Sequence, residues 1–112
     1  MELSSQTNGD LQIVAVNSAR IDAAVAIEFK DSMRQATDTP CPTVILDLSA
    51  VEFIDSSGLG AIVASMKHMG QERRLVLAGL TPTVDKVFRL TRMDSVFGVF
   101  PTLETALDAH AA

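Results

Sequence analysis

The amino-acid sequence predicts a single α/β domain over residues 1–112, with a mixed, mostly parallel sheet of about five strands and about four helices. Three observations support this fold class. Segments with strand-like and helical spacing of apolar residues alternate along the chain, an order that favours a parallel sheet. A turn signal separates the first two extended segments, which favours a hairpin at the start of the sheet. The length of 112 residues is usual for one compact domain.

The N-terminal hairpin is predicted from two extended segments, residues 2–7 and 11–15. Leu11, Ile13 and Ala15 place apolar side chains at alternate positions, as a strand with one buried face does. Asn8-Gly9-Asp10 lies between the two segments, and Asn and Gly tolerate the positive φ that a tight turn requires.

The first helix is predicted from about Ala23 to Thr37, with Asp22 as its N-cap. Its apolar residues recur at helical spacing: Val25, Phe29, Met33 and Ala36. Pro40 and Pro42 must interrupt this helix, because proline lacks an amide hydrogen and restricts the residue before it.

A central strand is predicted at Thr43–Leu48, where a β-branched, nearly all-apolar run is typical of a strand covered on both faces. A second helix follows from Ser57, with an apolar stripe of Leu59, Ile62, Val63, Met66 and Met69. Gly70 ends it, since glycine is favoured just after a helix. Another short strand is predicted at Leu75–Ala78.

The C-terminal third predicts two more helices and a last strand. Thr81-Pro82 begins a helix with a capping hydroxyl and a proline at its first position, and its buried face is Val84, Val87 and Phe88. Val96–Phe100 is predicted as the last strand. Pro101-Thr102 begins the final helix, which carries Leu103, Ala106 and Leu107.

The composition excludes several classes of partner. The net charge of -5 disfavours nucleic acid and direct binding to anionic membrane, and the chain has no Trp or Tyr to stack on bases. The longest nearly apolar stretch, residues 59–66, is too short to span a bilayer, and no signal peptide precedes it, so we expect a cytoplasmic protein. The single cysteine, Cys41, has no second thiol for a disulfide or a shared metal. We expect no cofactor and no metal.

The chemistry is concentrated between the buried strand and the second helix. Asp55, Ser56 and Ser57 are three consecutive residues of types that cap helices. Gly58 and Gly60 each cost a helix about 1 kcal/mol relative to Ala, so something other than helix stability favours them. The helix face opposite the apolar stripe is predicted to present small residues: Ser57, Ala61, Ala64 and Ser65. Such a helix start suits close approach by another backbone or by an anion, although capping and close packing on the sheet explain the same residues.

Catalysis at this helix start is not predicted. A serine at a strand-to-helix turn is typical of hydrolases, but Gly-x-Ser-x-Gly is absent. His68 lies twelve residues along the same helix, roughly 18 Å from Ser56, and His110 lies near the chain end, so both are predicted to be surface residues. The lysine of a phosphate-binding Gly-x-x-x-x-Gly-Lys-Ser/Thr loop is also missing. We therefore predict a protein that is not an enzyme.

The run from Val44 to Gly60, with Asp-Ser-Ser-Gly-Leu-Gly after a buried strand, closely resembles the signature of the bacterial anti-sigma factor antagonists of the STAS domain family. The order of strands and helices is similar to that family over essentially the whole chain. Residues 19–22 resemble the segment in which an acidic residue opens the family's first helix. They depart from it, because the family usually has a glycine before a polar residue and Leu-Asp, where this chain has Ser18-Ala19-Arg20-Ile21-Asp22.

The resemblance implies a partner switch. In that family, the serine directly after the motif aspartate, here Ser56, is phosphorylated by a cognate serine kinase that is also the anti-sigma factor. The unphosphorylated antagonist binds the kinase and frees the sigma factor, and a separate phosphatase resets the cycle. ATP belongs to the partner. The residues expected to contact the partner are Asp22, Asp55, Ser56, Ser57, Gly58, Gly60 and Ala61; a simple N-cap is the other interpretation of Asp22.

Two alternatives remain open at the level of sequence. A STAS domain can serve as a subunit of a membrane transport assembly, bound through the same helix without phosphorylation. It can also act as an adaptor that controls secretion or signalling in place of transcription, with the same switch chemistry and a different client.

Overall fold

The computed structural model describes residues 1–110, so the predicted domain of residues 1–112 ends two residues outside the described part. Its main sheet has the strand order β1-β2-β4-β6-β7. The five strands are β1 (Leu3–Asn8), β2 (Leu11–Val16), β4 (Thr43–Asp47), β6 (Arg74–Ala78) and β7 (Gly98–Phe100). The β1–β2 pair is antiparallel and every other neighbouring pair is parallel, which confirms the predicted mixed sheet with an N-terminal hairpin.

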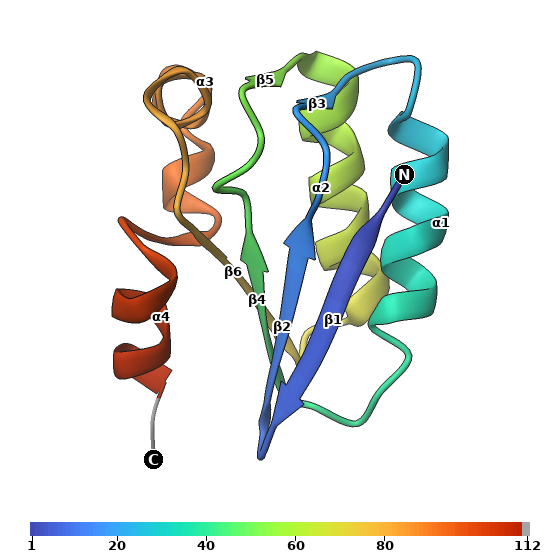
Figure 1. Ribbon diagram of the computed structural model, residues 1–112, viewed down its shortest axis with the longest axis vertical. Helices are drawn as coiled ribbons and strands as arrows, with labels where there is room; N and C mark the ends of the chain where they lie inside the picture. The colour runs from blue at the N-terminus through green and yellow to red at the C-terminus, as the bar shows by residue number, and fades with distance from the viewer. Residues whose placement is uncertain (111–112) are drawn as a thin grey trace.

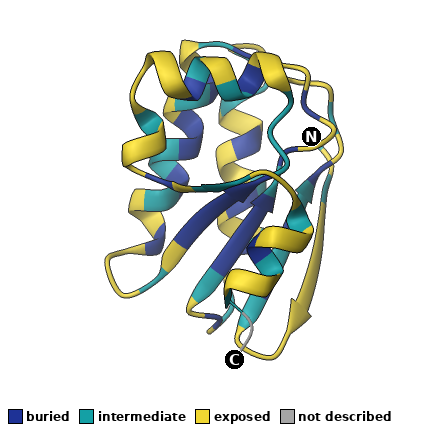
Figure 2. Cartoon of the chain, turned by 90° about the vertical axis from the view of Figure 1, so that its left-hand side faces the viewer, coloured by how far each residue is buried: buried dark blue, intermediate teal, exposed yellow. Residues whose placement is uncertain are grey.

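Residues 1–110 also contain four α-helices: α1 (Ala26–Ala36), α2 (Ser56–Met69), α3 (Pro82–Leu90) and α4 (Leu103–His110). The helices α1 and α2 run side by side on one face, and α4 lies on the other (Figure 1). The central strands β4 and β6 are mostly buried, whereas the edge strand β1 and the outer sides of the helices are exposed (Figure 2). Within residues 1–110, no helix is both long enough and apolar enough to cross a membrane.

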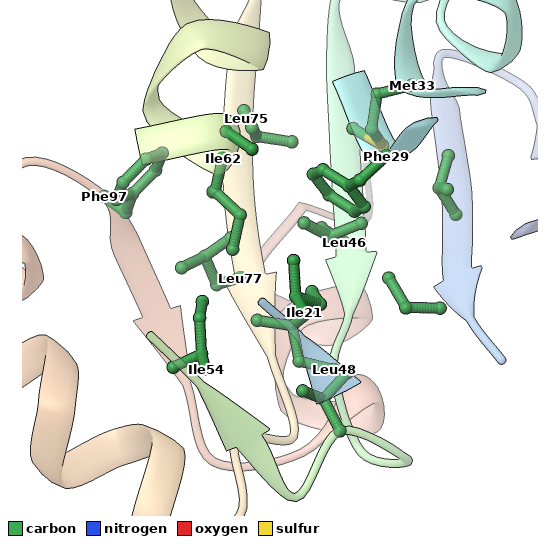
Figure 3. Close-up of a cluster of buried hydrophobic side chains, with 14 of the residues drawn as sticks. Ile21, Phe29, Met33, Leu46, Leu48, Ile54, Ile62, Leu75, Leu77 and Phe97 are labelled. Carbon is green, nitrogen blue, oxygen red and sulfur yellow. The ribbon is translucent and has the colours of Figure 1, made fainter. Parts of the chain in front are cut away.

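The central strand β4 is buried on both faces, as predicted. Leu46 belongs to the larger core cluster, where Phe29 and Met33 of α1 approach it (Figure 3). Ile45, on the opposite face, belongs to a smaller cluster with residues from β6 and with Ala106 of α4. Because consecutive strand residues point to opposite faces, one apolar strand supplies both cores.

Strand β2 differs from its predicted pattern. The face that carries Leu11, Ile13 and Ala15 is only partly buried, and Gln12 on the other face is completely buried. The Gln12 amide nitrogen donates to Ser5 Oγ and to the Ala36 carbonyl, and its oxygen accepts a hydrogen bond from Thr39 Oγ1. A buried amide is stable when its hydrogen bonds are made, so Gln12 joins the hairpin to the end of α1.

The last strand is shorter than predicted, covering Gly98–Phe100 where Val96–Phe100 was expected. A short 3₁₀ helix, η1 (Met93–Ser95), precedes it, and Val96 follows that turn. Phe97 is buried edge-to-face against Phe88 of α3, with ring centroids 6.1 Å apart. Phe97 therefore packs against α3 just before β7 begins.

Two short strands were not predicted. β3 (Arg20–Ile21) pairs in parallel with β5 (Phe53–Ile54), in the register Arg20–Phe53 and Ile21–Ile54. The pair lies beyond the carboxyl ends of β2 and β4, next to the start of α2 (Figure 1). Two-residue strands are too short for a periodic signal, and their pairing depends on segments 33 positions apart in register.

Candidate functional site

The second helix begins at Ser56, one residue earlier than predicted, with Asp55 as its N-cap. Asp55 Oδ1 accepts a hydrogen bond from the amide of Gly58 at 2.8 Å, and the Asp55 carbonyl accepts one from Leu59. Ser56 and Ser57 are therefore the first two helical residues, and both are exposed. Because the carboxylate of Asp55 is the cap, the fold does not need the Ser56 hydroxyl for this purpose.

The second carboxylate oxygen of Asp55 binds the loop that contains Ala23. Asp55 Oδ2 accepts a hydrogen bond from the Ala23 amide at 3.1 Å. The Gly58 amide is the main cause that lowers the pKa of Asp55, the amides of Ala23 and Ser57 act in the same direction, and desolvation opposes them. A carboxylate that accepts several backbone amides is stabilised in its ionised form, so Asp55 is charged at neutral pH.

The prediction that Asp22 caps the first helix is wrong, because α1 begins at Ala26 with Val25 in the N-cap position. The carboxylate of Asp22 accepts a hydrogen bond from the Ala24 amide and pairs with Arg20 Nε, both at 3.1 Å. The Asp22 carbonyl accepts one from Val25, which closes a turn. With the Ala23 amide held by Asp55, the chain completes this turn before it becomes helical. Asp22 thus lies in a loop that is hydrogen-bonded directly to the start of α2.

Gly58 is buried, and the fold itself explains it. A β-carbon at Gly58 would lie 1.9 Å from the carbonyl oxygen of Ile21 and 2.7 Å from its carbonyl carbon, both backbone atoms. Only glycine lets the first turn of α2 pack this closely against β3. Gly58 was expected to allow close approach of a partner, but the close approach that the structure shows is inside the chain.

The expectation that Ala61 and Ser65 face outward is also wrong. Ala61 is 3% exposed and Ser65 is 7% exposed. The neighbouring helix α1 packs along this side of α2, so the small residues make room for a helix of the same chain. Ala61, which was expected to contact a partner, lies in the core cluster.

Gly60 is the residue that the fold leaves unexplained. It is exposed, and a β-carbon there would meet nothing within 4 Å. Residues four apart share a helix face, so Gly60 lies one turn below Ser56 on the outer side of α2. The outward surface at this end of the molecule therefore includes Ser56, Ser57 and Gly60, with the loop of Asp22 beside it.

The sequence analysis missed an aromatic and basic pair next to this surface. The Arg20 guanidinium lies 4.2 Å from the ring centroid of Phe53, and Phe53 is 36% exposed. The two side chains come from paired positions of β3 and β5. In the sequence, the only sign of this pair was an aromatic residue shortly before Asp55. Its contact with Arg20 depends on the tertiary structure.

The two histidines lie away from Ser56. His68 is near the far end of α2, as expected from its spacing. His110 was expected to be a surface residue near a loosely held end, but in the structure its Nδ1 lies 2.9 Å from the Ala106 carbonyl oxygen and its ring packs edge-to-face on Phe100. It belongs to α4, on the other side of the sheet. Among residues 1–110, neither ring is placed to act as a base for Ser56, and no cluster of three metal-binding side chains occurs.

Comparisons with known proteins agree with this fold and motif. The STAS domain family model matches residues 2–106. The anti-sigma-F factor antagonist RsfB of Mycobacterium tuberculosis is 29% identical over 103 residues, which cover 90% of this chain and 84% of the relative. The anti-sigma-B factor antagonist of Listeria monocytogenes is 28% identical over 83 residues, 73% of each chain. A crystal structure of an anti-sigma factor antagonist from Mycobacterium paratuberculosis has a TM-score of 0.85 and 28% identity, covering 96% of this chain and 92% of that one. Because the STAS domain family model matches nearly the full length of this chain, the chain belongs to the STAS domain family.

Proposed function

We propose that this chain is a cytoplasmic anti-sigma factor antagonist that works by partner switching. Its unphosphorylated form binds an anti-sigma factor that is also a serine kinase, phosphorylation of Ser56 releases that partner, and a serine phosphatase restores the binding form. The observation that carries the proposal is the exposed Ser56 at the first position of α2, beside an aspartate that caps the helix in its place. The names of the relatives, antagonists of anti-sigma-F and anti-sigma-B factors, support the choice of partner.

The fold can accept a phosphoryl group at Ser56. Phosphorylation adds about -1.5 to -2 charge, and the partial positive charge of a helix N-terminus favours an anion there. The carboxylate of Asp55 is already turned toward the amides of Gly58 and Ala23. The modified protein can therefore keep its structure.

A partner pressed against the same surface would not accept that charge. The phosphoryl group would have to be desolvated in the interface, close to the ionised Asp55. A misplaced charge across an interface costs several kcal/mol, and about 4 kcal/mol corresponds to a thousandfold loss of affinity. One hydroxyl can thus control binding without a large change in shape.

The docking surface that we propose combines two chain segments. Ser56, Ser57 and Gly60 contribute from α2, and Asp22 contributes from the loop that Asp55 holds against the helix. The absence of a side chain at the exposed Gly60 supports close approach by a partner, since no contact within residues 1–110 requires glycine there. The partner supplies ATP and the catalytic groups for phosphorylation, so this chain acts as substrate and ligand.

The test is to incubate the protein with candidate kinases and ATP, and to locate the phosphate by mass spectrometry. Pull-downs then compare the wild type with Ser56→Ala, Ser56→Asp and the matched control Ser57→Ala. We expect phosphate on Ser56, constitutive binding by Ser56→Ala and weak binding by Ser56→Asp. Phosphate on Ser57 alone would overturn the site assignment, and equal binding by wild type, Ser56→Ala and Ser56→Asp would overturn the switch.

A further inference from the structure

A basic groove runs between α1 and α2, separate from the start of α2. The two helices lie side by side (Figure 1), and the hollow between them has a volume of about 480 Å³. Its charged and titratable lining residues are Lys30, Asp31, Arg34, Lys67 and His68. A chain with a net charge of -5 thus places three cations and one carboxylate in a single groove.

These cations are not neutralised inside the chain. Within residues 1–110, Lys30, Arg34 and Lys67 form no ion pair, whereas Arg20 and Arg89 both do. Lys30 and Arg34 are four positions apart on one helix face, and like charges at that spacing repel each other. Asp31, three positions before Arg34, offsets part of this repulsion, and the groove keeps an excess of positive charge that favours an acidic ligand.

A second hollow adjoins the groove and is lined by charged residues as well. It shares Arg34, Thr37 and His68 with the first, and its further charged lining residues are Asp38 and Arg73. The Arg73 guanidinium donates to the carbonyls of Thr37 and Cys41, both at 2.8 Å, so it is held in place, and within residues 1–110 it forms no ion pair. A ligand along α1 and α2 would therefore lie beside four cations (Lys30, Arg34, Lys67 and Arg73) and two carboxylates (Asp31 and Asp38).

The floor of the groove favours a protein segment over a small anion. A site for a small ligand needs convergent polar groups on its floor. Here the hydroxyls of Thr37 and Ser65 donate to the carbonyls of their own helices, Met33 and Ala61. The cations instead stand on the helix surfaces, and Ile27, which is 72% exposed, lies at the upper end. An exposed apolar side chain beside charged groups suits a protein interface, in which an apolar centre is surrounded by a polar rim.

We infer that the α1–α2 groove binds an acidic segment of a partner protein, with carboxylates facing Lys30, Arg34 and Lys67 and an apolar side chain against Ile27. The inference does not depend on the proposed switch, because Ser56 lies at the other end of α2 from Lys67 and His68. It gives the molecule a second docking surface that phosphorylation does not modify.

The test uses the ¹⁵N-labelled full chain and a capped Ala/Leu/Glu peptide of about 15 residues, a length that allows partial helix formation, with its glutamates on one face. A peptide with every Glu replaced by Gln is the first control, and inorganic phosphate is the second. We expect the acidic peptide to shift amide NMR signals in residues 27–37 and 64–68, and the two controls to leave them in place. Absence of these shifts would overturn the inference, as would equal shifts with the Gln peptide or with phosphate.

Charge reversal sharpens the test. The double variant Lys30→Glu/Arg34→Glu should weaken binding of the acidic peptide about tenfold and gain affinity for a lysine version of the peptide. The double variant Arg74→Glu/Lys86→Glu, which changes the net charge equally at two exposed residues outside the groove, is the matched control and should retain affinity within about twofold. An equal loss in this control would show attraction to the whole molecule and not to the groove. Ser56→Asp should bind the peptide like the wild type, which separates this result from that of the proposed switch.

Discussion

The carbonyl oxygen of Ile21 lies so close to Gly58 that a β-carbon on Gly58 would come within 1.9 Å of it. This contact sets the first turn of α2 against β3. The hydrogen bond from the Ala23 amide to Asp55 joins the same two segments, the chain that follows β3 and the start of α2. Two segments far apart in sequence thereby form one rigid support for Ser56.

The two glycines of the motif should respond in opposite ways to alanine. Gly58→Ala should destabilise the protein by about 1–3 kcal/mol or more, because the new methyl group meets backbone atoms that cannot move aside independently. Gly60→Ala, in open space on the same helix, should stabilise it by up to about 1 kcal/mol through helix propensity. Urea denaturation measures both changes. Equal effects of the two substitutions would contradict this account of Gly58.

Gly60→Ala also tests the proposed docking surface. If a partner approaches α2 at Gly60, the substitution should weaken binding of the anti-sigma factor while the protein itself becomes more stable. Titration calorimetry with the purified partner measures the affinity, and the urea experiment supplies the stability. Unchanged affinity would remove Gly60 from the proposed surface and leave Ser56 untouched.

The two hydrogen bonds of Asp55 can be separated by substitution. Asp55→Ala should lower Tm, because the amides of Gly58 and Ala23 both lose their acceptor. Asp55→Asn should lower it less, since the amide oxygen can still accept from Gly58 while the NH₂ group cannot accept from Ala23. A Tm of Asp55→Asn equal to that of Asp55→Ala would contradict the assignment of the cap to Oδ1.

The same carboxylate predicts a dependence of stability on pH. Its pKa is lower in the folded protein than the ordinary value of 3.8, so folding favours the ionised form. Its contribution is therefore fully present above that ordinary value and is lost as the pH falls below it, toward the lowered pKa. The Tm difference between wild type and Asp55→Ala should shrink in that acid range. A difference that stays constant down to the lowest pH at which both fold would contradict the lowered pKa.

Two adjacent arginines should differ strongly in their importance for stability. Arg73 donates to the carbonyls of Thr37 and Cys41, after the end of α1, whereas the side chain of Arg74 is exposed. Arg73→Ala should cost about 2 kcal/mol, because hydrogen bonds from a charged donor are lost. Arg74→Ala should change the free energy of unfolding by less than about 0.5 kcal/mol. Chemical denaturation of both variants checks the contrast, and similar costs would show that the Arg73 bonds contribute little.

Phe53 should affect partner binding more than folding. Its ring is 36% exposed beneath the Arg20 guanidinium, next to the proposed surface. Phe53→Ala should weaken binding of the anti-sigma factor by about tenfold, because aromatic side chains are enriched among the residues that dominate the affinity of an interface. Leu90→Ala is the matched control, since Leu90 is 74% exposed on α3 and should leave the affinity unchanged. Equal affinities of the two variants would place Phe53 outside the interface.

Much of the fold follows from patterns within short stretches of the sequence. The alternation of strand and helix patterns predicted the mixed sheet, the apolar run predicted the doubly buried β4, and three capping residues located the start of α2 to within one residue. These features depend on neighbours in the chain, so their signals are local. The choice of Ser56 over Ser57 came from the resemblance to a family and stays a prediction.

Which surfaces are covered depends on how the helices and strands pack against one another. Helical spacing placed the small residues Ala61 and Ser65 on one face of α2, but it could not show that α1 packs on that face. The residue type of Asp22 favoured it as a helix cap. In the structure the Ala23 amide instead donates to Asp55, and after a turn the helix begins at Ala26. The physical reason is the same in both cases: the side chain or amide finds its partner about thirty positions away, and a local pattern carries no information about such a partner.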